Sequence, residues 1–179
     1  GQAGLFYWLH GALGRHHASA VRDGVMAEHL STSYLAFFTM ALVGASMGGA
    51  LIFLSDNPIL RPVIFAGTAA LIARGFLLMD METTRAGQMV KRFTLFEGGQ
   101  YLGGMIIGVI LISFFDIRAA GPLWGVAIAN LIGALIGLGF VISLAGRFAP
   151  NRKTLSRMVS YGAPIAISSL LSLVISVSD

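Results

Sequence analysis

The sequence contains no cysteine and few charged residues. Without cysteine the chain has no disulfide, no cysteine-ligated metal centre and no thiol nucleophile. Charged side chains make up 11% of its 179 residues, whereas a soluble globular domain has about 25%. So few charges cannot cover the surface of a soluble protein of this size. A soluble enzyme and a nucleic-acid-binding domain are therefore excluded, despite the net charge of +4.

Motifs for catalysis are missing as well. The sequence has no G-x-S-x-G, H-E-x-x-H or phosphate-binding loop pattern, and no apolar run contains two carboxylates. The adjacent residues His16 and His17 have no third candidate ligand, and neighbouring side chains on a helix diverge. We therefore predict no enzyme activity, no metal site and no cofactor. Asp80 and Glu82 are interpreted as a charge cluster at a helix end.

Apolar residues, by contrast, make up 56% of the chain, and 23 residues are glycine. The apolar runs are continuous, as in residues 105–112 (MIIGVILI), whereas barrel strands alternate apolar and polar residues. These features predict an integral membrane protein of the all-α class. Pairs of glycines four residues apart predict close helix packing, and they occur at positions 44/48, 99/103, 104/108, 121/125 and 133/137.

A helix needs about 20 mostly apolar residues to cross the hydrocarbon core of a bilayer. Five segments are long enough, and we predict them as full spans: residues 34–54, 62–79, 98–115, 121–146 and 158–178. Residues 1–14 are too short and are predicted to be the end of an earlier helix. The whole chain, residues 1–179, is then one transmembrane helix bundle. Since both ends lie in apolar runs, we expect a fragment of a longer polytopic protein.

Lysine and arginine collect on one side of these predicted spans. Nine of them lie before span 34–54, between spans 62–79 and 98–115, or between the last two spans: Arg15, Arg22, Arg85, Lys91, Arg92, Arg147, Arg152, Lys153 and Arg157. The opposite side has only Arg61 and Arg118. Because cytoplasmic loops are enriched in Lys and Arg, segments 80–97 and 147–157 are predicted to be cytoplasmic. Segment 80–97 is also predicted to prolong its two flanking helices.

Arg74 lies inside a predicted span. An arginine at the centre of a membrane helix costs about 2.5–3.5 kcal/mol on insertion scales, so it normally has a partner or faces water. Two interpretations remain open: the side chain reaches the headgroups or forms a structural ion pair, or it holds an anionic substrate. Asp80 is six residues further on, about 9 Å along a helix, and is therefore a poor intrahelical partner.

The other polar positions in the spans are weaker candidates. Gln100, Asn130 and Asp179 could face a cavity, although hydrogen bonds between helices explain Gln100 and Asn130 more simply. Serines 168, 172 and 176 share one face of the last span, which favours close packing over a wet cavity. Pro164 is predicted to kink that helix, because proline leaves a backbone carbonyl without its donor.

Two segments resemble a known family. Residues 161–165 (YGAPI), followed by the serine-rich run that ends at Asp179, resemble the seventh span of bacterial polysaccharide-export flippases. Residues 6–8 (FYW) with 13–15 (LGR) are similar to the end of the second span in the same family. These O-antigen and lipid-linked oligosaccharide flippases belong to the multidrug/oligosaccharidyl-lipid/polysaccharide flippase superfamily. On this register the chain covers the end of span two, spans three to six, and most of span seven.

The resemblance implies a transporter of twelve to fourteen spans, in two halves around a central cavity, in the bacterial inner membrane. It would move an undecaprenyl-diphosphate-linked oligosaccharide to the outer leaflet for polysaccharide or lipopolysaccharide synthesis, using alternating access. Its partners would be this lipid-linked substrate, membrane lipids and the missing remainder of its own chain, with no nucleic acid. Arg74 matches the family's basic cavity residues, which offset the diphosphate charge.

Alternative functions belong to other classes. A drug or cation antiporter of the same superfamily would require acidic residues in the spans. A membrane-embedded glycosyltransferase would require carboxylates near the headgroups, where only Asp80 and Glu82 are available. A non-catalytic scaffold subunit would require neither.

Overall fold

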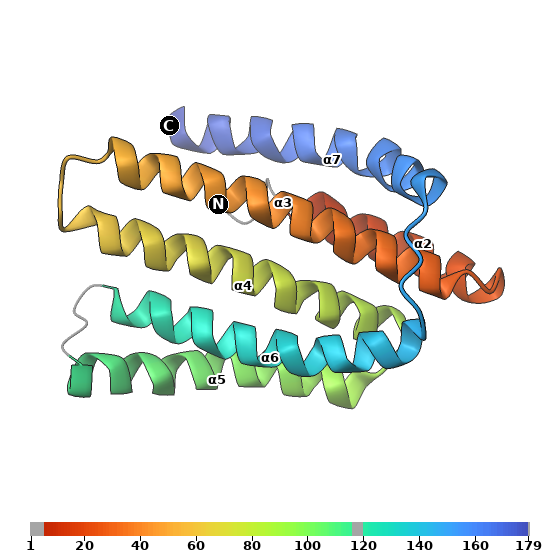
Figure 1. The fold of residues 1–179 in the computed structure, drawn as a ribbon, viewed down its shortest axis with the longest axis horizontal. Helices are drawn as coiled ribbons and strands as arrows, with labels where there is room; N and C mark the ends of the chain where they lie inside the picture. The colour runs from red at the N-terminus through yellow and green to blue at the C-terminus, as the bar shows by residue number, and fades with distance from the viewer. Residues whose placement is uncertain (1–5, 116–119, 179) are drawn as a thin grey trace.

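The computed structural model describes residues 6–115 and 120–178 of the chain. This part is helical throughout apart from short connections, and its long helices run side by side (Figure 1). The helices are α2 (Tyr7–Arg22), α3 (Met26–Leu54), α4 (Leu60–Ala86), α5 (Val90–Phe115), α6 (Gly121–Ala145) and α7 (Arg152–Ser178). The predicted all-α class is confirmed.

Four of the described helices, α3 to α6, are long and apolar enough to cross a membrane. They contain the predicted spans 34–54, 62–79 and 98–115 whole, and all but the last residue of 121–146. The chain is therefore a membrane-embedded helical protein. The fifth span, within α7, and the partial span ending in α2 stay predictions, as does the wider architecture of two halves.

Several helices continue beyond their apolar segments into the stretches that contain most of the Lys and Arg residues. Segment 80–97, predicted as a cytoplasmic loop that prolongs its neighbours, is helical except at residues 87–89. Likewise the connection after α6 ends at Asn151, so residues 152–157 belong to α7. The prediction that segment 80–97 prolongs its two flanking helices is therefore confirmed. Hydropathy marks where side chains become polar, whereas backbone hydrogen bonds continue the helix beyond that point.

Glycines bring α5 and α6 into direct contact. Gly104 and Gly108 of α5 face Val126 and Pro122 of α6, and an added Cβ on Gly125 would lie 2.6 Å from the Gly108 Cα. Gly121 of α6 is similarly close to Ile112 of α5. The prediction that spaced glycines allow close helix packing is confirmed at this seam.

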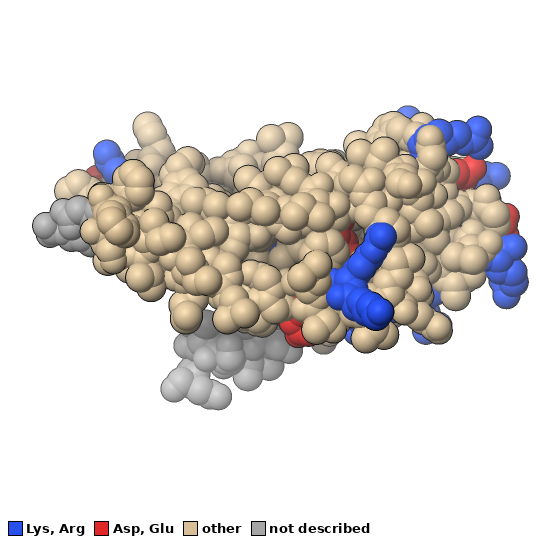
Figure 2. Space-filling model, turned by 90° about the horizontal axis from the view of Figure 1, so that it is seen from below, with Lys and Arg blue, Asp and Glu red and all other residues tan. Residues whose placement is uncertain are grey.

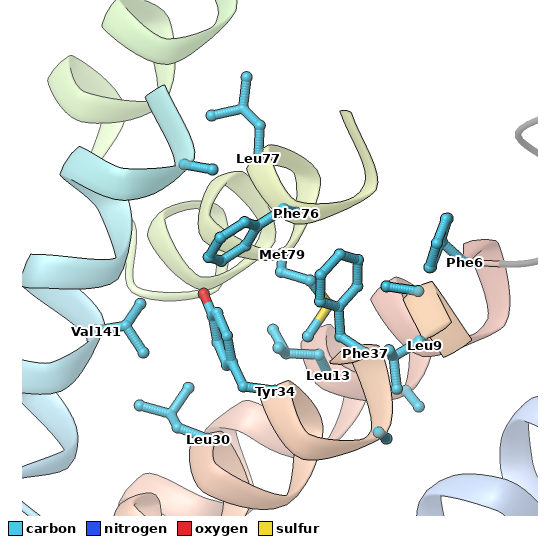
Figure 3. Close-up of a cluster of buried hydrophobic side chains, with 14 of the residues drawn as sticks. Phe6, Leu9, Leu13, Leu30, Tyr34, Phe37, Phe76, Leu77, Met79 and Val141 are labelled. Atoms are coloured by element: carbon cyan, nitrogen blue, oxygen red, sulfur yellow. The ribbon is translucent and has the colours of Figure 1, made fainter. Parts of the chain in front are cut away.

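The hydrophobic core lies where α2, α3 and α4 meet (Figure 3). Leu9 and Leu13 of α2 lie one helical turn apart and are completely buried. Phe37 of α3 stacks on Phe76 of α4, with ring centroids 5.4 Å apart. These contacts fix the positions of the three helices that carry most of the polar residues discussed below.

Charged side chains are concentrated at one end of the molecule (Figure 2). This is the end at which α2, α4 and α6 finish and α3, α5 and α7 begin. Between the two ends, large apolar side chains such as Leu42, Met105 and Leu135 are exposed. An apolar belt with charges mainly at one end is the surface that a protein with the predicted topology needs.

Candidate functional site

A polar hollow of about 530 Å³ lies among α2, α4, α5 and α7. Arg74 and Glu82 of α4 line it together with Gln100 and Tyr101 of α5. A second hollow of about 740 Å³ adjoins it toward the charged end and adds Arg15 and His16 of α2. The two hollows share Gly11, Glu82, Arg85 and Tyr161. We refer to them together as the polar vestibule.

Arg74 contacts α5 at the inner part of the polar vestibule. Its Nη1 donates a hydrogen bond of 3.5 Å to Gln100 Oε1, and its guanidinium carbon lies 5.9 Å from the ring centre of Tyr101. Its Nε is buried and has no hydrogen-bond partner among the described residues. The described residues provide no ion pair for Arg74. The arginine therefore has unused hydrogen-bonding capacity beside an open polar space.

The outer part of the polar vestibule has a second set of charges. Glu82 accepts a 2.7 Å salt bridge from Arg85 Nη2, and its carboxylate lies directly against Gly14 of α2, where a Cβ would collide with it. The Arg15 guanidinium carbon lies 5.4 Å from the ring centre of Tyr161 on α7. Arginine and aromatic rings thus occur together here, as they do around Arg74.

The charge of the polar vestibule is positive. Among the described residues, three arginines line it against two glutamates, Glu82 and Glu97, and Glu82 is already paired with Arg85. Burial, followed by the nearby charges of Arg15 and Arg157, lowers the pKa of His16. His16 is therefore neutral near pH 7 and does not add to this charge.

This arrangement is suited to binding an anion. A guanidinium can donate two parallel hydrogen bonds to phosphate oxygens, and the rings of Tyr101 and Tyr161 offer flat apolar faces beside the charges. Within the described residues, no group of three or more His, Asp or Glu side chains could hold a metal ion.

The remaining candidates from the sequence lie apart from this site. Of the described residues that the sequence marked as substrate or cavity candidates, Arg74 and Gln100 line the polar vestibule. Asn130 is fully buried in α6, and neither polar atom of its side chain has a partner among the described residues. Pro164 lies inside α7, which continues through it. Asp179 lies outside the described residues.

The burial of Asp80 was not predicted from the sequence. Interpreting it with Glu82 as a charge cluster at a helix end was wrong, because Asp80 is only 1% exposed and lies between α3, α4 and α6. Two residues apart on a helix means about 200° of rotation, so Glu82 faces the polar vestibule while Asp80 faces the opposite side. The sequence offered one signal: Asp80 directly follows the apolar span 62–79 without a turn residue between them.

No protein-family model, no curated protein and no solved structure matches this chain.

Proposed function

We propose that this chain is part of a membrane transporter that moves an anionic, diphosphate-linked lipid oligosaccharide across the bacterial inner membrane. The observation that carries the proposal is the polar vestibule, in which Arg74 lies inside a membrane helix beside open space and has no acidic partner among the described residues. Burial of an arginine in a bilayer is costly, so an arginine inside a membrane helix indicates a functional site by default.

The substrate class follows from the chemistry of the polar vestibule. A diphosphate needs fixed positive charge when it leaves water, because charge pairs are far stronger in a medium of low dielectric. Arg74 and Arg15 provide that charge, and each lies near a tyrosine ring that can contact an adjoining sugar. The resemblance of residues 161–165 to a flippase span points to the same cargo.

A drug or cation antiporter is the second candidate. It would require acidic residues in the spans, and Asp80 is such a residue. However, Asp80 does not line the polar vestibule, whose lining has more arginine than glutamate. The location of the carboxylate therefore favours an anionic cargo over a cationic one.

Substitution of Arg74 tests the proposal. In the full-length protein in its own bacterium, Arg74→Lys, Arg74→Ala and Arg74→Glu are compared for surface polysaccharide and for protein abundance. We expect near-normal abundance in all three, with export weakened by Lys, more by Ala and most by Glu. Lys keeps the charge but loses the bidentate geometry, whereas Glu reverses the charge.

Arg61→Ala is the matched control, because Arg61 is an exposed arginine in the same helix at the opposite end. It should leave both export and abundance unchanged. Normal export from Arg74→Ala would contradict a role in substrate binding. Loss of the protein itself, in Arg74→Ala but not Arg61→Ala, would show that Arg74 is structural.

A further inference from the structure

Asp80 is a buried carboxyl group that accepts a hydrogen bond from a single donor among the described residues. Tyr34 of α3 donates its hydroxyl to Asp80 Oδ1, and Figure 3 shows this hydroxyl directed from α3 toward α4. The other oxygen, Oδ2, is buried and has no hydrogen-bond partner among the described residues. Both side chains are almost inaccessible, with Tyr34 5% exposed and Asp80 1% exposed.

Within the described part of the chain, no positively charged side chain is paired with Asp80. Helix α6 has no ionisable side chain along its whole length, and α3 contributes only Tyr34 at this position. On α4 itself, Arg74 is bonded to Gln100 and Arg85 is bonded to Glu82.

The charged and titratable groups of the other neighbouring helices have other partners. From α5, Arg92 lies over the Phe140 ring, 4.0 Å from its centre. On α2, His17 faces His29 of α3, with ring centres 6.3 Å apart.

These surroundings favour a neutral carboxyl group. A buried carboxylate with one donor and no cation carries a large desolvation penalty, and in practice such a group takes up a proton instead. A neutral carboxyl group that leaves one oxygen unpaired costs much less, because no charge is buried. The arrangement is therefore far better suited to Asp80 with a proton than without one.

Access to Oδ2 is blocked by α6. Gly137 lies directly on the carboxyl group, and any Cβ at that position would overlap the Asp80 side chain. Beside Tyr34, an apolar hollow of about 400 Å³ between α3 and α6 is lined by Leu30, Leu138 and Val141. The exposed Arg147, in the connection after α6, also lines this hollow. Gly137 therefore covers Oδ2 where α6 packs against α4.

We propose that Asp80 and Tyr34 form a proton-binding site whose occupancy is coupled to the packing of α6 against α4. The proton is bound while Gly137 covers the carboxyl group, and it leaves to water when that contact opens. This site lies on the opposite side of α4 from the polar vestibule, and the proposal does not depend on which substrate the polar vestibule binds.

Infrared spectroscopy of the full-length protein in lipid nanodiscs tests the proposal. During a titration from mildly acidic to alkaline pH, we expect a carbonyl stretch of a protonated carboxylic acid that is lost as the pH rises. The band should be absent from Asp80→Asn and present in Glu82→Gln, the matched control two residues away. In Tyr34→Phe the band should be lost only at higher pH, since the carboxylate then has no donor.

Thermal unfolding across the same pH range tests the coupling to packing. The folded protein keeps the proton that the unfolded chain releases, so stability should fall as the pH rises. Asp80→Asn cannot ionise, so this dependence should be weaker in that variant. A wild-type protein without an Asp80-dependent band would overturn the proton site. A pH dependence identical in wild type and Asp80→Asn would overturn the coupling to packing.

Discussion

Buried polar side chains in this bundle differ in whether they have a hydrogen-bond partner among the described residues. Gln100 and Asn130 are both buried amides on membrane helices. Gln100 accepts a hydrogen bond from Arg74, whereas both polar atoms of Asn130 are without a described partner. The two residues look alike in the sequence, but their energetic roles are opposite, because an unpaired buried amide destabilises a fold.

Replacement of Asn130 tests this difference. Asn130→Leu should stabilise the chain by about 1–3 kcal/mol, since it removes an unpaired buried polar group and keeps a similar shape. Gln100→Leu should instead destabilise it, because Arg74 then loses its acceptor. Thermal unfolding of both variants in detergent gives the comparison. A lower unfolding temperature for Asn130→Leu would show that the amide does have a partner.

At the scale of the elements, the α5–α6 seam depends on the absence of side chains. Gly108 of α5 and Gly125 of α6 bring the two backbones close enough that a single added carbon does not fit. Without a strong hydrophobic drive between helices in lipid, this close contact is a main source of their association. Elsewhere on α6, Gly139 has open space around it.

These two glycines of α6 provide a matched pair of substitutions. Gly125→Leu should destabilise the bundle by about 1–3 kcal/mol or more, because the new side chain meets backbone that cannot move aside. Gly139→Leu adds the same side chain on the same helix toward open space and should have little effect. Unfolding in detergent measures both. Equal effects would mean that helix propensity, and not the seam, controls the result.

The whole molecule has a charged end and a nearly uncharged end. The connection between α4 and α5 and the connection between α6 and α7 both lie at the charged end, and the turn between α3 and α4 lies at the other (Figure 1). The bias of Lys and Arg predicts that the charged end faces the cytoplasm. The chain is free of cysteine, so single cysteines can be introduced without further changes.

Single-cysteine labelling in intact cells tests this orientation. Thr94→Cys and Lys153→Cys, both at exposed positions near the charged end, should be protected from a membrane-impermeant thiol reagent. Asn57→Cys, exposed in the turn between α3 and α4, should react. Permeabilised cells provide the control, in which all three should react. The reverse pattern in intact cells would invert the topology.

Much of the fold could be predicted from the sequence for a simple physical reason. Segments of about 20 apolar residues must form helices in a bilayer, because every backbone polar group has to be satisfied within the segment. The positions of α3 to α6 and the helix breaks at residues 55–59 and 146–151 follow from hydropathy, proline and glycine. Close packing of α5 on α6 likewise follows from the spacing of Gly104, Gly108, Gly121 and Gly125.

The sites depend on which helix faces become neighbours, and this only the tertiary structure decides. Arg74 could be singled out in the sequence, since an arginine within an apolar span is unusual. Its contact with Gln100, and the adjoining hollow to which α2 contributes Arg15, result from packing. Asp80 and Glu82 are nearly adjacent in the sequence, yet one is sealed under Gly137 and the other is paired with Arg85. Hydropathy fixes how far a helix extends, whereas burial of a single carboxyl group depends on the rotation of that helix against its neighbours.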